Sequence, residues 1–183
     1  MKRIIKYASS LDFFTSFTPE DQRQLLLSNT DMLVNIRSAR LLRPGINLTS
    51  QICHATGQTS GAMELFKSPE RLEYRQIFQS PWACDAVHED KFADLMESLF
   101  HLEMDKTTTT LMGLIVLFSS SHADVKETSR CIQNQEFFSQ MLYRYLCSKI
   151  GRSNAITLLP KYMYLISQLE EMAQIMITKR LTL

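Results

Sequence analysis

The order of apolar and polar positions predicts a chain made almost entirely of helices, organised around one long stretch. From Thr18 to Arg43 the sequence runs for about seven helical turns without an interior glycine or proline. Thr18 can cap this helix, and Pro19 suits its first turn. Its apolar residues lie on all sides of the axis, which predicts a central helix buried all round. Arg37 interrupts that pattern, because a buried guanidinium needs a carboxylate, carbonyl, water or ligand oxygen as partner.

Five further segments carry helical patterns. A helix is expected at the start of the chain, and residues 88–103 carry one apolar stripe. The run after Asp105 is apolar on all sides and predicts a second core helix. An amphipathic helix then ends at a glycine, and a final helix follows. The expected segments are 1–13, 88–103, 105–119, 124–150 and a helix from about Ser153 onward.

Between the long helices, residues 44–81 lose helical periodicity and contain three glycines. Short strands, with a small irregular or β segment around 45–66, and a short helix near 70–78 are expected there. The fold class predicted from the whole pattern is an all-α, layered domain.

The last helix has apolar residues at sustained heptad spacing, in two rows. The rows are Ala155, Tyr162, Leu169 and Met176, and Leu158, Leu165 and Met172. Such spacing over three heptads is typical of a helix that pairs with a partner. Packing of the same residues on their own domain explains the spacing equally well, so both interpretations stay open.

Composition narrows the class of protein without indicating a reaction. The chain has 183 residues and a formal net charge of +1, so one domain is expected and no charge excess points to nucleic acid or an anionic membrane. Cys53, Cys84, Cys131 and Cys147 form no CxxC pair, which favours reduced intracellular thiols over disulfides or zinc. The sequence has no apolar run of about 18 residues, so no membrane span is predicted.

Motifs for catalysis do not occur in the sequence. It contains no glycine-rich phosphate loop, HExxH, GxSxG or close His/Cys cluster. The four histidines are scattered, and each is expected to be a surface or structural residue. Binding is therefore favoured over catalysis.

A short motif near the start resembles the signature of nuclear receptor ligand-binding domains. That signature is an aromatic-Ala-Lys start, F-x-x-L, three residues, D-Q, two residues and L-L. The chain matches it except for Ser9 in place of the lysine and Phe17 in place of the leucine. The matching residues are Tyr7, Ala8, Phe14, Asp21, Gln22, Leu25 and Leu26.

Later segments resemble the family in the same order. Residues 105–119 resemble the eighth helix, 128–149 the ninth, and the stretch from Leu158 the tenth and eleventh, which form the family's dimerisation helix. The resemblance implies a layered antiparallel helical sandwich over residues 1–183, without enzyme activity. It also implies a nuclear location, with the cytoplasm as a second one. DNA contact and zinc belong to a DNA-binding domain that these residues do not include.

The resemblance also implies a ligand and a set of residues around it. Residues 21–40 are most similar to the vitamin D receptor-like group and the related thyroid-hormone-type receptors, in which an arginine at the position of Arg37 faces the pocket. A lipophilic, sterol-like ligand is expected. For the apolar pocket residues, ordinary packing in the core is the alternative to ligand contact. By position, the pocket residues are Met1, Ile5, Val34, Asn35, Arg37, Ser38 and Leu41.

Two surfaces for protein partners are implied in the same way. The coregulator groove, which takes LxxLL-type peptides in the family, would involve Ser9, Phe14, Gln22, Arg23, Leu26 and Leu27. Ser9 and Leu27 replace lysines and Arg23 replaces an apolar residue, so weakened or altered peptide binding is expected. A retinoid X receptor-like partner or a second copy would dock on Leu158, Tyr162, Leu165, Leu169, Met172 and Met176.

Two functions follow as hypotheses. The first is a ligand-binding and dimerisation domain of a ligand-regulated transcription factor. The second is an interaction module with the same fold that heterodimerises without ligand-driven activation. The family's first helices and its terminal activation helix have no counterpart in the sequence, which suggests a partial domain: a fragment, a truncated isoform or a divergent receptor.

Overall fold

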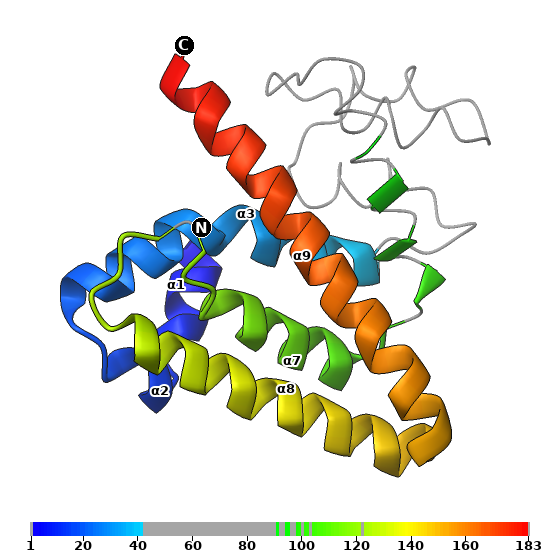
Figure 1. Ribbon diagram of the computed structural model, residues 1–183. Coiled ribbons are helices and arrows are strands. Elements are labelled where there is room, and N and C mark those ends of the chain that lie inside the picture. The colour runs from blue at the N-terminus through cyan, green and yellow to red at the C-terminus, as the bar shows by residue number, and fades with distance from the viewer. Residues whose placement is uncertain are drawn as a thin grey trace, which may run out of the picture.

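In the computed structural model, the part of the chain that is described is all-α. Its backbone is described for residues 2–41, 91, 94, 95, 98, 99, 101, 102, 104–121 and 123–182, and its side chains for these residues except 2, 3, 38–41 and 176–182. The described helices with assigned bounds are α1 (Lys2–Ala8), α2 (Asp12–Thr15), α3 (Pro19–Leu41), α7 (Lys106–Leu117), α8 (Thr128–Ile150) and α9 (Arg152–Thr182), shown in Figure 1. Every regular element among these residues is a helix, as predicted. The segment expected to be irregular or β around 45–66 lies outside them.

The most enclosed helix is α7, which packs against α3, α8 and α9. Every residue from Leu111 to Phe118 is buried. Asp105 begins this helix, because its carboxylate accepts the Thr108 backbone N–H at 2.7 Å. The prediction of a second core helix in this segment is therefore confirmed.

The expectation that α3 is buried all round is wrong. Its start agrees with the sequence: the Thr18 hydroxyl oxygen accepts the Asp21 backbone N–H at 3.2 Å. Leu27 and Val34, however, are 54% and 44% exposed. The buried face carries residues three or four apart, which are Asp21, Leu25, Asn29, Met32 and Ile36. The long apolar pattern thus covers one buried face and an apolar outer face, which periodicity alone could not separate.

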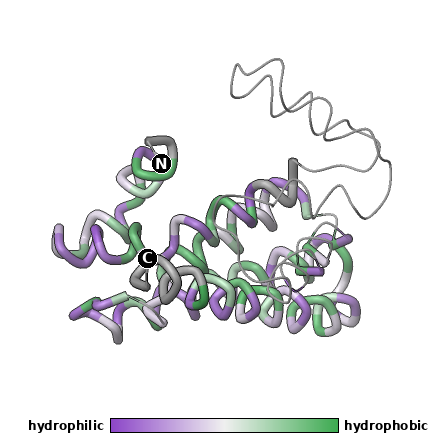
Figure 2. The backbone as a smooth tube through the Cα atoms, turned by 90° about the horizontal axis from the view of Figure 1, so that it is seen from above, coloured by the Kyte–Doolittle hydropathy of each residue, from purple (hydrophilic) through white to green (hydrophobic). Residues whose placement is uncertain are grey.

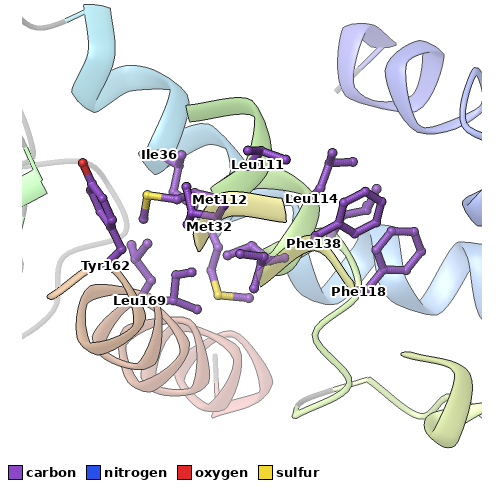
Figure 3. Close-up of a cluster of buried hydrophobic side chains, with 14 of the residues drawn as sticks. Met32, Ile36, Leu111, Met112, Leu114, Phe118, Phe138, Tyr162 and Leu169 are labelled. Atoms are coloured by element: carbon purple, nitrogen blue, oxygen red, sulfur yellow. The ribbon is translucent and has the colours of Figure 1, made fainter. Parts of the chain in front are cut away.

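Side chains from α3, α7, α8 and α9 form much of the core, to which Ala8, Phe14, Leu95 and Leu99 also belong. Figure 3 shows Met32 and Ile36 of α3 and Met112 of α7 directed toward Leu169 of α9. At the other end of the core, the Phe118 and Phe138 rings stack with centroids 5.8 Å apart. Apolar and polar residues alternate along the outer helices in Figure 2, as expected for helices with one buried face.

The remaining helices differ from the sequence predictions mainly at their ends. The expected helix over 1–13 divides into α1 and α2, and α8 begins at Thr128 instead of residue 124. In the expected helix 88–103, the described positions 91, 94, 95, 98, 99 and 101 are helical, with Leu95 and Leu99 buried. Gly151 ends α8 with φ +81° and ψ 155°, a region that essentially only glycine adopts, and α9 starts at the next residue.

Two glycines should respond oppositely to replacement by alanine. A Cβ on Gly113 would lie 3.7 Å from a Leu33 methyl carbon, an ordinary contact. Gly113→Ala should therefore stabilise α7 by about 0.5–1 kcal/mol, because alanine is the better helix former. Gly151→Ala should destabilise by about 1–3 kcal/mol through strain at positive φ. Urea unfolding of both variants tests this pair, and a destabilised Gly113→Ala would contradict the packing described for α3 and α7.

Candidate functional site

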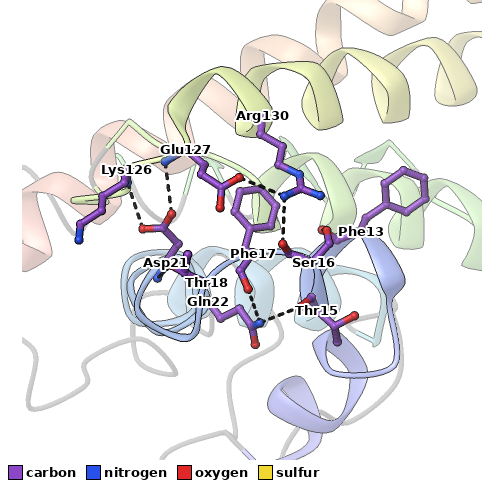
Figure 4. Close-up of polar contacts among 10 residues, drawn as sticks. All are labelled: Phe13, Thr15, Ser16, Phe17, Thr18, Asp21, Gln22, Lys126, Glu127 and Arg130. Atoms are coloured by element: carbon purple, nitrogen blue, oxygen red, sulfur yellow. Dashed lines mark hydrogen bonds and ion pairs between the residues drawn. The ribbon is translucent and has the colours of Figure 1, made fainter.

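The acidic residue of the motif, Asp21, joins the start of α3 to the start of α8. Its side chain has no exposed surface. The two carboxylate oxygens accept the backbone N–H groups of Lys126, at 3.0 Å, and Glu127, at 3.3 Å, as Figure 4 shows. These donors precede the first turn of α8, where N–H groups lack partners within the helix. The buried negative charge is thus satisfied by two fixed donors next to a positive helix end.

Contacts of Gln22 and Phe17, which belong to the same motif, stabilise the turn between α2 and α3. The Gln22 amide nitrogen donates to the carbonyl oxygens of Phe17, at 2.8 Å, and Thr15, at 3.2 Å. From α8, the Arg130 guanidinium lies 5.0 Å from the centre of the Phe17 ring. It also donates to the Ser16 carbonyl at 3.0 Å and pairs with Glu127 at the same distance. The motif is therefore a structural lock between the α2–α3 turn and the start of α8.

The predicted groove residues differ in how far they are exposed, and one of them, Gln22, belongs to this lock. Phe14 is 1% exposed, and the Gln22 amide is engaged with the backbone, so both contribute to the fold. Ser9 and Arg23 are exposed. Leu27 is exposed and Leu26 half-buried, so α3 presents an apolar surface beside Arg23.

The predicted pocket residues are brought together only in part. Arg37 is exposed, so the expectation that its guanidinium is buried is wrong. Val34 is 44% and Ile5 42% exposed, and Asn35 is half-buried. Met1 and the side chains of Ser38 and Leu41 lie outside the described part of the chain. Arg37 and Val34 thus share the outer side of α3, and water can solvate the guanidinium.

Most residues of the predicted dimer seam lie in the chain's own core. The described members are Tyr162, Leu165, Leu169 and Met172, which are 3%, 5%, 1% and 7% exposed, and the half-buried Leu158. The side chain of Met176 lies outside the description. Their spacing is therefore accounted for by packing of α9 on its own domain, the alternative that the sequence left open.

The outer side of α9 carries a different, charge-free stripe. Ile156 and Tyr164 are 55% and 63% exposed, the two highest values among the large apolar side chains of the described residues. They lie four residues before and after Pro160, on the same side of the helix. Ser153, three residues before Ile156, and Ser167, three residues after Tyr164, extend this stripe. The sequence pattern could have indicated it, because the charged residues nearest to it on this side of the helix, Arg152 and Glu171, lie only at its two ends.

A second polar cluster, which the sequence did not indicate, surrounds Asp105. Its carboxylate caps α7, accepts a hydrogen bond from the Tyr145 hydroxyl and pairs with Lys149 at 2.7 Å. Partial burial acts to raise the pKa of Asp105, but the hydrogen bonds from Lys149, Tyr145 and Thr108 outweigh it and hold that pKa well below its ordinary value. Burial, followed by the charge of Asp105, raises the pKa of Tyr162 on α9 to about 12. This cluster holds the start of α7 to the second half of α8.

Asp105 should make the stability of the fold sensitive to acid. A carboxylate whose pKa is depressed in the folded state contributes stability above its unfolded pKa, about 4, and loses it as the pH falls toward the folded pKa. Stability of the wild type should therefore decline below about pH 4, and the decline should be shallower in Asp105→Asn. Denaturant unfolding between pH 6 and pH 2 measures both. Parallel pH profiles for the two proteins would contradict this role of Asp105.

Other polar and reactive groups serve the fold. The Asn29 side-chain amide nitrogen donates to the carbonyl oxygens of Leu117, at 3.1 Å, and Ser119, at 2.8 Å, near the end of α7. The Ser119 hydroxyl donates to Glu170 of α9 at 2.5 Å. Burial, with smaller effects of Asp21 and Glu127, raises the pKa of the Cys131 thiol to about 11, which disfavours its nucleophilic thiolate form.

The described residues give no indication of two other kinds of site. They contain no group of three or more His, Cys, Asp or Glu side chains placed to hold a metal ion. None of their helices combines the length and the hydropathy needed to span a membrane.

Residues 1–181 match the family model described as the ligand-binding domain of nuclear hormone receptor. A search of curated proteins found no match. The family match covers nearly the whole chain, including the lock, the α9 stripe and the Asp105 cluster.

Proposed function

Because the chain belongs to the ligand-binding domains of nuclear hormone receptors, we propose that it binds a small lipophilic, sterol-like ligand and pairs with another receptor domain through α9. The family is non-enzymatic and implies a ligand-regulated transcription factor. The observation that carries the proposal is the family match over residues 1–181. Residues 21–40 support the vitamin D receptor-like or thyroid-hormone-type group. A nuclear location and DNA contact through a separate zinc-containing domain belong to the same proposal.

Ligand would act by shifting the population of conformations of the domain. A ligand changes such an equilibrium only by its difference in affinity for the two conformations, and the partner surfaces transmit that difference. The α3–α7–α9 core provides the rigid frame, because α7 is enclosed by helices that carry the proposed pocket and the dimer face. The pocket would lie against the second half of α3.

Arg37 is proposed to hold the polar group of the ligand. Its charge lies beside Val34, three residues away, so an apolar ligand body and a hydroxyl or carboxyl group could contact the same stretch. Exposure of Arg37 supports access by a ligand, while the alternative role is that of an ordinary solvated arginine. Asn35 and Ile5 would extend the wall.

Binding of the fluorescent sterol dehydroergosterol tests the role of Arg37. The wild type should bind it saturably, and Arg37→Ala should weaken binding by roughly tenfold, because a hydrogen bond to a charged donor is lost. Arg144→Ala, an exposed arginine of α8, is the matched control and should leave affinity unchanged. Equal affinity in wild type and Arg37→Ala would contradict the assigned role.

The proposed dimer face is the α9 stripe defined by Ser153, Ile156, Pro160, Tyr164 and Ser167. Interface centres are depleted in charge and enriched in aromatic residues, which describes this stripe. In a twofold antiparallel pairing about Pro160, Ile156 of one copy lies near Tyr164 of the other. The same face could instead receive a retinoid X receptor-like domain.

Charges on the α9 stripe should abolish pairing without unfolding the chain. Ile156→Glu with Tyr164→Glu replaces exposed side chains, so near-UV circular dichroism should be retained. Sedimentation of the protein alone and mixed with a retinoid X receptor ligand-binding domain should show loss of the dimer. Ile132→Glu on α8, where Ile132 is 49% exposed, is the matched control. Dimers that survive the double change would exclude this face.

The second candidate function is a heterodimerising module without ligand-driven activation. It is favoured by one specific observation: Ser9 and Leu27 stand where the signature of the family has lysines that hold a coactivator helix. A chain that pairs through α9 but binds no sterol would support this alternative.

A further inference from the structure

The connection between α7 and α8 is irregular and exposes a serine. Its described residues, 119–121 and 123–127, contain no helix, and Figure 1 shows them leaving the end of α7 and returning to the start of α8. We name these residues the α7–α8 segment. Ser121 is exposed, whereas Ser119 is 1% exposed and its carbonyl accepts the Asn29 amide at 2.8 Å. The segment is therefore anchored at Ser119 and accessible at Ser121.

The middle of the α7–α8 segment is held by local backbone hydrogen bonds. The Ala123 N–H donates to the Ser120 carbonyl at 3.4 Å, and the Val125 N–H donates to the Ala123 carbonyl at 2.9 Å. Local bonds at the surface open at lower cost than those of a packed helix. An enzyme that binds its substrate in extended form can therefore reach Ser121 while α7 and α8 stay folded.

A carboxylate follows Ser121 at a spacing of three residues. Asp124 carries it, and its side chain is exposed like that of Ser121. An enzyme with basic residues beside its active site would bind this carboxylate while it acts on the serine hydroxyl, because opposite charges favour that alignment.

The same spacing occurs at other described hydroxyl residues, but in less suitable surroundings. These residues are Ser9, Thr18, Ser28 and Ser167. The Thr18 hydroxyl caps α3, and Ser28 and Ser167 lie inside α3 and α9. Ser9 is exposed, but its N–H donates to the Ile5 carbonyl at the end of α1. Ser121 alone among them combines exposure with a backbone outside the helices and their ends.

The side chain of Ser121 is also linked to α9. The Ser119 hydroxyl donates to a Glu170 carboxylate oxygen at 2.5 Å, and the hydroxyl oxygens of Ser119 and Ser121 lie 3.2 Å apart. The Ser121 N–H donates to the Ser119 hydroxyl oxygen at 3.5 Å. Ser121 is thus separated from a carboxylate of α9 by a single hydroxyl group.

We propose that Ser121 is a phosphorylation site for a protein kinase that recognises the carboxylate of Asp124. In this reaction the Ser121 hydroxyl oxygen bonds to the γ-phosphorus of ATP, and the bond from that phosphorus to the oxygen bridging it to the β-phosphorus breaks. ADP leaves with the electron pair of that bond, and the hydroxyl proton passes to the base of the kinase.

The phosphate weakens the contact between the α7–α8 segment and α9. It adds about two negative charges at pH 7 to Ser121. Because Ser119 bonds both to this side chain and to Glu170, the new charge lies close to the Glu170 carboxylate and repels it. This effect requires neither the proposed ligand nor the proposed dimer.

Phosphorylation of the whole chain by casein kinase II, an acid-directed kinase, tests the site. Mass spectrometry should locate the phosphate on Ser121, and Ser121→Ala should remove it. Asp124→Asn should slow its incorporation roughly tenfold, because the recognised charge is lost. Ser9→Ala is the matched control, with the same acidic spacing, and should be phosphorylated at the wild-type rate. Near-UV circular dichroism establishes that each variant is folded.

Three results overturn the proposal. The first is a folded chain that takes up no phosphate from a kinase preparation that phosphorylates casein. The second is incorporation that Ser121→Ala leaves unchanged. The third is a wild-type rate of incorporation in Asp124→Asn.

Hydrogen–deuterium exchange tests the effect of the phosphate on the contact with α9. Exchange over residues 118–125 should be severalfold faster in the phosphorylated chain than in the unmodified chain, because the segment is released. In Glu170→Gln the acceptor oxygen is kept and the charge removed, so phosphorylation should speed exchange less. An equal increase in the wild type and in Glu170→Gln would contradict repulsion between the phosphate and Glu170.

Discussion

A buried carboxylate connects the two halves of this fold. Asp21 has no exposed surface, and its oxygens accept two backbone N–H groups more than a hundred residues away in sequence. An ionised group can be buried only when such donors are fixed in place. The arrangement therefore depends on the start of α8 lying against the start of α3. The Gln22 amide and the Arg130 guanidinium hold the turn beside it.

The contacts of Asp21 help to enclose α7. With α3 held against α8 at Asp21, α7 occupies the space between them, and α9 closes the remaining side. At the opposite end of α7, the carboxylate of Asp105 is likewise bonded to α8, through the side chains of Tyr145 and Lys149. Leu27 and Val34 of α3, and Ile156 and Tyr164 of α9, lie exposed on the outer sides of these two helices, while other exposed apolar residues lie on α1, α2 and α8.

Sequence alone predicted the helices well and the surfaces poorly, for a physical reason. Helix patterns and stop signals are local, so the helix after Asp105 and the stop at Gly151 were predictable. Burial depends on which elements meet. Arg37 was expected to be buried and is exposed, while Tyr162 and Leu169 were assigned to a partner and lie in the core. The motif identified Asp21, but nothing in residues 126–130 marks them as its partners.

Hydrogen–deuterium exchange of Asp21→Ala tests the lock most directly. The backbone amides of Lys126 and Glu127 should lose their protection, and the free energy of unfolding should fall by about 1–3 kcal/mol, because two buried donors lose their acceptor. Asp21→Asn keeps one carbonyl oxygen and should show a smaller change in both quantities. Unchanged protection at these amides, together with unchanged stability, would contradict the account that Asp21 holds α8 to α3.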